Sequence, residues 1–465
     1  PAHRDYRSAR WSHPTIEKLT VSTSQETRTM FRALKVSLIV GLVALAGFFP
    51  SGLSRAVADD WPQWGGPQRD LVWRETGIVD QLPDAEILPR VWSAPIGEGY
   101  GGPSVANGRV YVMDRLREGQ LERVLCLDAT TGDVIWQHDY EARYSISYPA
   151  GPRCTPVVDG DRVYAVGAMG HMFCLKTEDG SVVWKRNFVD EFGTKLPTWG
   201  MVASPLIDGN QLITLVGGSD NSLVVSFDKT TGKELWRALQ DSGVGYAPPV
   251  IFEFGGRRQL IMWHPEAVSS LDPANGSVIW QVPYRVRAGL SIATPRKFEN
   301  KLFVASFYNG PRMIEVSDDG ASATVAWAGK SDNEIRTDGV HPIMCTPWFD
   351  GKNIYSICSY GQLRCLDASN GNRLWETLEA TGKARWWNAF IIPHGDRFFI
   401  HNEQGDLIIA RLSPSGYEEV SRAKLIEPTR KVQRRMTIWS HPAFAMKSVF
   451  ARNDKEIVRV NLAAD

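Results

Sequence analysis

The sequence predicts an all-β protein, an eight-bladed β-propeller whose ring is closed by strands from the N-terminal and C-terminal ends of the propeller. Three observations lead to this prediction: a strand–turn–strand ending that recurs, a hairpin before each ending, and unmatched strands at the two ends. Repeats of about 40–50 residues with four strands each are typical of propellers.

The recurring ending is a strand, a tight turn with a glycine, and a strand that carries tryptophan. The glycine stands four residues before the tryptophan and supplies the positive φ that a short hairpin needs. The clear copies are LDATTGDVIW, LKTEDGSVVW, FDKTTGKELW, LDPANGSVIW and LDASNGNRLW. A weaker copy places Val420 four residues after Gly416. Together with the strands around Trp92 and Trp327, these copies predict eight outer strands.

Two further strands joined by a turn precede each ending. The clear examples are SVANGRVYVM, VVDGDRVYAV, LIDGNQLITL and WFDGKNIYSI, whose Asn-Gly and Asp-Gly pairs are strong hairpin signals. The strand around Trp92 has no such hairpin before it, and the strands in 443–462 have no outer strand after them. We expect these two sets to pair, which closes the ring and leaves no exposed sheet edge there.

Four segments are expected along the chain. Residues 1–29 are polar and are expected to be disordered or a gene-model artefact. Residues 30–58 have the charged start, apolar run and small-residue cleavage site of a signal peptide, with an uncleaved anchor as the alternative. Residues 59–86 form an arm that is expected to cross the propeller and bury Trp61 and Trp64. Residues 87–465 form the propeller.

The signal peptide predicts a periplasmic or secreted protein with no stable membrane span after cleavage. No cysteine lies near Ala58, so a lipid anchor is not expected. The 52 basic residues balance the 52 acidic ones, which argues against nucleic acid as a partner. We expect a monomer whose partner is an envelope protein or a surface polymer.

The six cysteines include no Cys-x-x-Cys pair, so neither a zinc site nor a redox pair is indicated. Cys126, Cys174 and Cys365 share one repeat position, and Cys154 and Cys345 share another. Equivalent positions on different blades are too far apart to bridge. We interpret these residues as buried strand residues, with a bond inside one blade, such as Cys154 to Cys174, as the alternative.

The loops that lead into the inner strands are unusually rich in arginine and aromatic residues, and in a propeller these loops share one face. Arginine pairs with carboxylates and phosphates, and tryptophan and tyrosine offer flat faces. We therefore predict an anionic, planar or sugar-like ligand at this mouth; the alternative is that these residues bind the loops to one another. The candidate ligand-binding residues are Tyr100, Arg153, Trp199, Tyr246, Arg287, His341, Arg385, Trp386, Asn388, Arg435 and His441. Other members of the patch are Arg285, Arg336, Trp387, Arg434 and Trp439. No catalytic set and no metal site is predicted.

The x-D-x-x-T/N-G-x-x-x-W ending resembles the tryptophan-docking repeat of pyrroloquinoline quinone (PQQ) dehydrogenases and of non-enzymatic propellers such as BamB. The stretch WPQWGGPQRD at 61–70 is similar to the arm of secreted PQQ-like repeat proteins of planctomycete-type bacteria. The resemblance implies that one tryptophan per blade docks between neighbouring sheets. These tryptophans are Trp92, Trp136, Trp184, Trp236, Trp280, Trp327 and Trp375.

Two functions follow from these observations. The first is an exported, non-catalytic propeller without a cofactor, a binding or scaffold module for an envelope protein or an anionic or polysaccharide ligand. The alternative is a PQQ-dependent oxidoreductase that acts on an alcohol or sugar, with PQQ and Ca²⁺ at the mouth. The adjacent cysteines and the carboxylate–amide–carboxylate calcium set of such enzymes are not evident in the sequence, which favours the first hypothesis.

Overall fold

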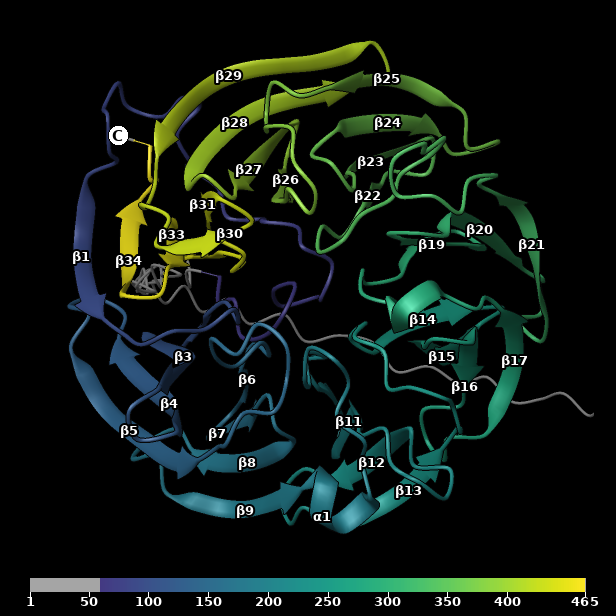
Figure 1. Ribbon diagram of the computed structural model, residues 1–465, viewed down its shortest axis with the longest axis horizontal. Helices are drawn as coiled ribbons and strands as arrows, with labels where there is room; N and C mark the ends of the chain where they lie inside the picture. Colours follow the sequence, from purple (N-terminus) through teal and green to yellow (C-terminus); the bar gives the residue numbers. More distant parts are fainter. Residues whose placement is uncertain (1–58, 465) are drawn as a thin grey trace, which may run out of the picture. The chain divides into compact units, whose positions relative to one another are not determined.

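The computed structural model describes residues 59–464, and these form a ring of eight four-stranded antiparallel sheets (Figure 1). The predicted fold class is therefore confirmed. The predicted upstream segment and signal peptide, residues 1–58, lie outside the described residues, as does Asp465. Helix is confined to α1 (Phe188–Phe192) and the 3-10 turn η1 (Arg287–Gly289) in the described part of the chain. Neither has the length or the apolar character that a membrane crossing needs.

Each blade runs in chain order from its inner strand to its outer strand. Blades 1 to 4 consist of β2 (Ser104–Ala106), β3 (Arg109–Leu116), β4 (Leu121–Asp128), β5 (Val134–Glu141); β6 (Val157–Asp159), β7 (Arg162–Val166), β8 (His171–Lys176), β9 (Val182–Asn187); β10 (Leu206–Asp208), β11 (Gln211–Leu215), β12 (Val224–Asp228), β13 (Glu234–Ala238); and β14 (Val250–Phe254), β15 (Arg257–Trp263), β16 (Ala267–Leu271), β17 (Val278–Pro283).

Blades 5 to 7 consist of β18 (Arg296–Phe298), β19 (Lys301–Ser306), β20 (Gly310–Val316), β21 (Ala323–Ala328); β22 (Trp348–Phe349), β23 (Asn353–Ile357), β24 (Leu363–Asp367), β25 (Arg373–Thr377); and β26 (Ala389–His394), β27 (Arg397–Asn402), β28 (Asp406–Ser413), β29 (Gly416–Lys424). A small hairpin, β30 (Arg430–Val432) with β31 (Arg435–Thr437), stands in the loop after blade 7.

Blade 8 closes the ring in the predicted way. Its three inner strands are β32 (Ala443–Ala445), β33 (Ser448–Arg452) and β34 (Glu456–Asn461), and its outer strand is β1 (Arg90–Pro95) from the other end of the propeller. Trp92 pairs with Arg459, and Arg90 forms an ion pair of 2.7 Å with Glu456. Because the outer strand is drawn from the far end of the chain, separating the two ends would open the ring.

Tryptophans fill seven of the eight seams between blades, as the resemblance implied. In five seams the indole N–H donates to a turn carbonyl of the next blade; the accepting residues are Ala129, Thr177, Lys229, Ala368 and Ser413. In the seams after blades 3 and 4 a glutamine relays the contact. Trp236 donates to Gln211, which donates to Pro273 O, and Trp280 donates to Gln259, which donates to Gly320 O.

The turn glycines have a second role besides their positive φ. Gly180 has φ 73°, and a Cβ there would lie 2.5 Å from the ring of Trp136 in the preceding blade. The same close approach recurs at Gly132, Gly232, Gly276 and Gly371. A side chain at these turns would therefore displace the docked indole as well as strain the backbone.

The seam between blades 7 and 8 lacks a tryptophan and is filled differently. Val420 of β29 packs against the core that blades 7 and 8 share, and so does Leu82 of the segment before β1. The N–H of Leu82 donates to Ser421 Oγ at 2.9 Å, and the N–H of Leu88 donates to Lys424 O at 2.8 Å. Part of the N-terminal segment thus takes the place of an indole.

The first part of the arm of residues 59–86 crosses the middle of the ring as the purple trace in Figure 1. Trp61 pairs with Val105 of blade 1, and the backbone N–H of Trp73 donates to Pro393 O of blade 7. Trp61 and Trp73 are buried, whereas Trp64 is only partly buried. The arm therefore closes the channel between the inner strands.

All six cysteines are free and buried. Burial raises the pKa of the Cys126 thiol to about 11 and that of Cys345 to about 12. These thiols therefore stay protonated at neutral pH and act as small core residues. The structure bears out this interpretation and contradicts the alternative bond from Cys154 to Cys174.

Candidate functional site

A cavity of about 220 Å³ occupies the central channel at the mouth, the face that carries the loops into the inner strands. Trp64 of the arm contributes to its wall, and its indole N–H donates to Thr294 Oγ1 at 2.9 Å. Below it, the buried Arg69 donates to Ser204 O, Pro205 O and Pro249 O of blades 3 and 4. Because the arm closes the channel on that side, the cavity is a pocket rather than a tunnel.

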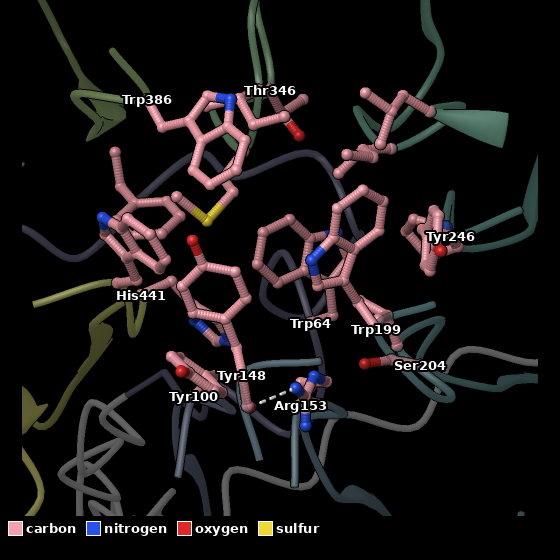
Figure 2. A pocket seen from close by; sticks show the side chains of 18 of the residues that line it. Trp64, Tyr100, Tyr148, Arg153, Trp199, Ser204, Tyr246, Thr346, Trp386 and His441 are labelled. Carbon is pink, nitrogen blue, oxygen red and sulfur yellow. Dashed lines mark hydrogen bonds between the residues drawn. The ribbon is translucent and has the colours of Figure 1, made fainter. Parts of the chain in front are cut away.

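The pocket is mainly aromatic, and side chains from nearly every blade surround it (Figure 2). On one side Tyr148 lies 6.0 Å from Trp386 and 5.9 Å from Trp439, measured between ring centroids. On another side Trp199 lies 5.7 Å from Tyr246. The nine aromatic lining residues are Trp64, Tyr100, Tyr148, Trp199, Tyr246, Tyr308, Trp386, Phe390 and Trp439.

Three of the lining residues have a left-handed backbone although none is glycine. Tyr148 has φ 53°, Ala288 has φ 58° and Trp386 has φ 64°. For bulky residues this region is unfavourable, and such strain concentrates at binding and active sites. The strained backbone places the rings of Tyr148 and Trp386 in the pocket wall.

The only cation in the lining, Arg153, is already satisfied by the protein. Its guanidinium donates to the backbone carbonyls of Gly151, Tyr148 and Ser147, and it lies 4.9 Å from the ring centroid of Tyr100. Burial lowers the pKa of Arg153. This arginine therefore shapes the mouth loop, and the pocket offers an anion little free charge.

His441 joins the pocket wall to blades 1 and 2. Its Nε2 lies 2.6 Å from Thr155 Oγ1 and accepts the N–H of Gly102 at 3.2 Å, while Nδ1 lies 3.2 Å from Pro442 O. Since an amide N–H can only donate, Nε2 is the acceptor and Nδ1 carries the proton. Burial lowers the pKa of His441 to about 4, so the ring is neutral at neutral pH.

Six of the eleven candidate residues line the pocket: Tyr100, Arg153, Trp199, Tyr246, Trp386 and His441. The structure places the other five elsewhere. Arg287 is exposed on the rim, 4.6 Å from the ring centroid of Tyr308. His341 is buried beside Phe307 O and Asp338, and burial lowers its pKa.

The remaining three of these five candidates belong to a network behind the pocket wall. Arg385 donates to both carboxylate oxygens of Glu334. Arg435 pairs with the fully buried Glu403, which also accepts the indole N–H of Trp439 at 3.0 Å. Asn388 is buried next to this network, and its side-chain amide has no hydrogen-bond partner among the described residues. Arg385 and Arg435 thus serve as loop-to-loop ion pairs.

Several lining residues were not among the candidates: Trp64, Tyr148, Tyr308 and Phe390. Tyr148 lies in the long loop between β5 and β6, and Tyr308 lies in the short turn between β19 and β20; no motif marks either side chain as pointing inward. Trp64 was expected to be buried by the arm, but its contribution to the pocket wall depends on the path of the arm across the ring.

The lining does not fit PQQ with calcium. It contains no Asp, Glu, Asn or Gln side chain, and its one arginine is committed to backbone carbonyls. Among residues 59–464 no three His, Cys, Asp or Glu side chains come together in a way that could hold a metal ion. The six cysteines are free, so the adjacent-cysteine ring of these dehydrogenases has no counterpart.

The fold and the repeated seams define a PQQ-like β-propeller, a class that includes both enzymes and non-enzymatic proteins. The family model described as outer membrane protein assembly factor BamB matches residues 120–377 and 264–464. The chain therefore belongs to this family.

Relatives of both kinds are similar in sequence. BamB of Shewanella oneidensis is 24% identical over 335 residues, which cover 64% of this chain and 73% of that protein. The quinohemoprotein alcohol dehydrogenase ADH-IIG of Pseudomonas putida is 24% identical over 239 residues, which cover 47% of this chain and 32% of that enzyme. The chain thus matches only about a third of the length of that dehydrogenase.

Solved structures show the same fold. The crystal structure of BamB from Moraxella catarrhalis has a TM-score of 0.54 at 16% identity and covers 81% of this chain and 98% of that one. A europium-containing methanol dehydrogenase has a TM-score of 0.59 at 12% identity and covers 86% of this chain and 89% of that one. At these low sequence identities the structural similarity establishes the propeller fold alone. The function has to be inferred from the residues of the site.

Proposed function

We propose that this protein is an exported, non-catalytic propeller that binds a polysaccharide through the aromatic pocket at its mouth. One observation carries the proposal: nine aromatic residues surround a pocket whose only cation is already bonded to the protein. Aromatic rings with a polar end supply large contact area and hydrogen bonds at the same site. A sugar ring matches this combination, because it offers apolar C–H faces and hydroxyl groups at its edge.

Polar groups for the hydroxyls are present in the lining. Thr155, Ser204 and Thr346 contribute hydroxyl groups. Ligand pockets commonly combine an apolar lining with a few such polar groups. These groups can orient a ring without carrying charge.

The alternative is a PQQ-dependent oxidoreductase, which the dehydrogenase relatives bring into consideration. The lining lacks the charged groups that would hold a quinone carboxylate or a calcium ion, and this favours a binding module. An envelope protein is the other partner considered, and a concave pocket of about 220 Å³ favours a ring-sized ligand over a flat protein surface.

Calorimetric titration and tryptophan fluorescence of the purified protein test the proposal. We expect binding to members of a panel of oligosaccharides and no binding of PQQ with Ca²⁺. Trp199→Ala should weaken oligosaccharide binding at least tenfold, whereas Phe298→Ala, an exposed aromatic at the opposite end of its blade, should leave it unchanged. Tight PQQ binding together with dye-linked alcohol or sugar oxidation would instead establish the enzyme.

A further inference from the structure

The aromatic pocket adjoins further hollows on the mouth face. A second hollow of about 620 Å³ lies beside it on the mouth face, between the loops that lead into blades 4 and 5. Tyr246 and Ala288 line both cavities, so the two adjoin. A third, more polar hollow shares Pro197 and Thr198 with the second. Together these hollows form a continuous groove, named here the rim groove, that leads outward from the pocket.

The charge of the rim groove differs from that of the pocket. Arg285 and Arg287 both line the second hollow, and Glu266 is its one acidic lining residue. The Arg285 side chain is 85% exposed and lies 3.6 Å from Glu266. Arg287 forms no ion pair within residues 59–464. An uncompensated guanidinium therefore stands at the junction of groove and pocket.

The junction is held by backbone contacts that fix the position of Arg287. The N–H of Arg287 donates to Asn309 Oδ1 at 2.8 Å, and the N–H of Val286 donates to Pro265 O at 2.7 Å. The next residue, Ala288, has the left-handed φ noted above and lines both cavities. The Arg287 guanidinium rests against the ring of Tyr308, a pocket residue. A ligand leaving the pocket here would meet this arginine.

We propose that the ligand is an acidic polysaccharide, with a terminal or branch sugar in the aromatic pocket and a neighbouring acidic unit against Arg287 in the rim groove. This inference rests on the proposed function. A pocket closed by the arm admits the end of a chain or a branch, and the groove provides the exit for the following units. Arginine binds carboxylate and sulfate groups by paired hydrogen bonds, so both anion chemistries suit the site.

The experiment compares acidic hexasaccharides with their charge-neutralised partners by calorimetry. The probes are galacturonate, mannuronate and guluronate hexamers with their methyl esters, and a sulfated galactose hexamer with its desulfated form. We expect at least one acidic hexamer to bind at least fivefold more tightly than its neutral partner. Whether the carboxylated or the sulfated hexamers show this preference identifies the anionic group that is bound. The preference should shrink at 500 mM salt, because exposed charges are screened.

Substitutions at Arg287 test whether the preference for acidic hexamers arises in the rim groove. Arg287→Ala should bring acidic and neutral hexamers to within twofold of each other, and Arg287→Lys should keep part of the difference. The matched control is Arg411→Ala, an exposed arginine of β28, which should change nothing. Equal binding of acidic and neutral hexamers, or an unchanged preference in Arg287→Ala, would overturn the inference while the polysaccharide function stands. Failure of every hexamer to bind would overturn the proposed function and this inference with it.

Discussion

The two ends of the central channel are built from different chemistry. At the arm end, Arg69 is buried, and its guanidinium donates to carbonyls of two blades, while Trp61 and Trp73 pack into the core. At the mouth end, aromatic rings such as those of Tyr148 and Trp199 surround a cavity. Buried side chains packed against or bonded to the blades indicate a structural role, whereas aromatic rings that line a cavity indicate a surface available to a ligand. The comparison separates the part of the channel that holds the ring from the part that binds.

Removing the arm-end arginine should have the largest effect on stability. Arg69→Ala leaves the carbonyls of Ser204, Pro205 and Pro249 without their donor, and each such buried group costs about 1–3 kcal/mol. We expect the free energy of unfolding to fall by at least about 3 kcal/mol in denaturant titration. Arg74→Ala, which removes an exposed ion pair with Asp70, should cost less than about 1 kcal/mol. Similar losses in both variants would remove the structural distinction claimed for the arm.

Acid should destabilise the mouth through its histidines. Burial lowers the pKa of both His441 and His401 to about 4 in the folded protein, whereas the unfolded chain takes up protons near pH 6.5. The unfolded state therefore binds more protons between pH 6.5 and 4, and stability falls as the pH drops through this range. The loss is on the order of 3 kcal/mol for each histidine.

Thermal melting from pH 7 to 4 measures this loss. His441→Gln retains an acceptor for Gly102 N–H and Thr155 but does not titrate here, so its melting temperature should depend less steeply on pH than that of the parent protein. An identical pH dependence in the variant would show that His441 does not contribute.

A smaller effect is expected at the seams, which belong to neither end of the channel. Gly180→Ala places a methyl group against the docked Trp136, whereas Gly160→Ala, also at positive φ, meets no atom within 4 Å. Both variants carry the backbone cost of about 1 kcal/mol, and Gly180→Ala adds the displacement of the indole. Urea titration should therefore show the larger loss for Gly180→Ala. Equal losses would mean that the indole adapts without cost.

The smallest stability change should come from the mouth. Trp386→Phe removes an indole N–H that has no partner, so the free energy of unfolding should change by less than about 1 kcal/mol. Oligosaccharide affinity should nevertheless fall several-fold, because the smaller ring offers the ligand less contact area in the pocket wall. If stability falls strongly and affinity is unaffected, Trp386 belongs with the structural residues of the arm end.

The ring was predictable because its signals are local and repeated. The glycine–tryptophan spacing identifies each outer strand, and counting the strands at both ends predicted that the strand around Trp92 would pair with the strands in 443–462. The roles of Gln211 and Gln259 were not predictable, since nothing in the sequence shows that these side chains relay a seam contact.

The pocket was predictable only in part. The composition of the loops indicated the face on which the pocket lies and six of the residues that line it. The expected positive charge, however, is not found inside the pocket. Arg385 and Arg435 found carboxylates at Glu334 and Glu403, which lie on other loops and whose proximity depends on the folded ring. The direction of Tyr148 depends on a left-handed backbone that no sequence signal announces. Pairings between loops and unusual backbone angles are properties of the assembled propeller.

The eighth blade also constrains the order in which the protein can mature. Because β1 finds its neighbour only in β34, the first outer strand has no partner until residues 456–461 have been made. During synthesis β1 must therefore wait as an unpaired strand, a state in which strand edges attract other chains. We expect this interval to be the time when the polypeptide depends most on cellular folding helpers.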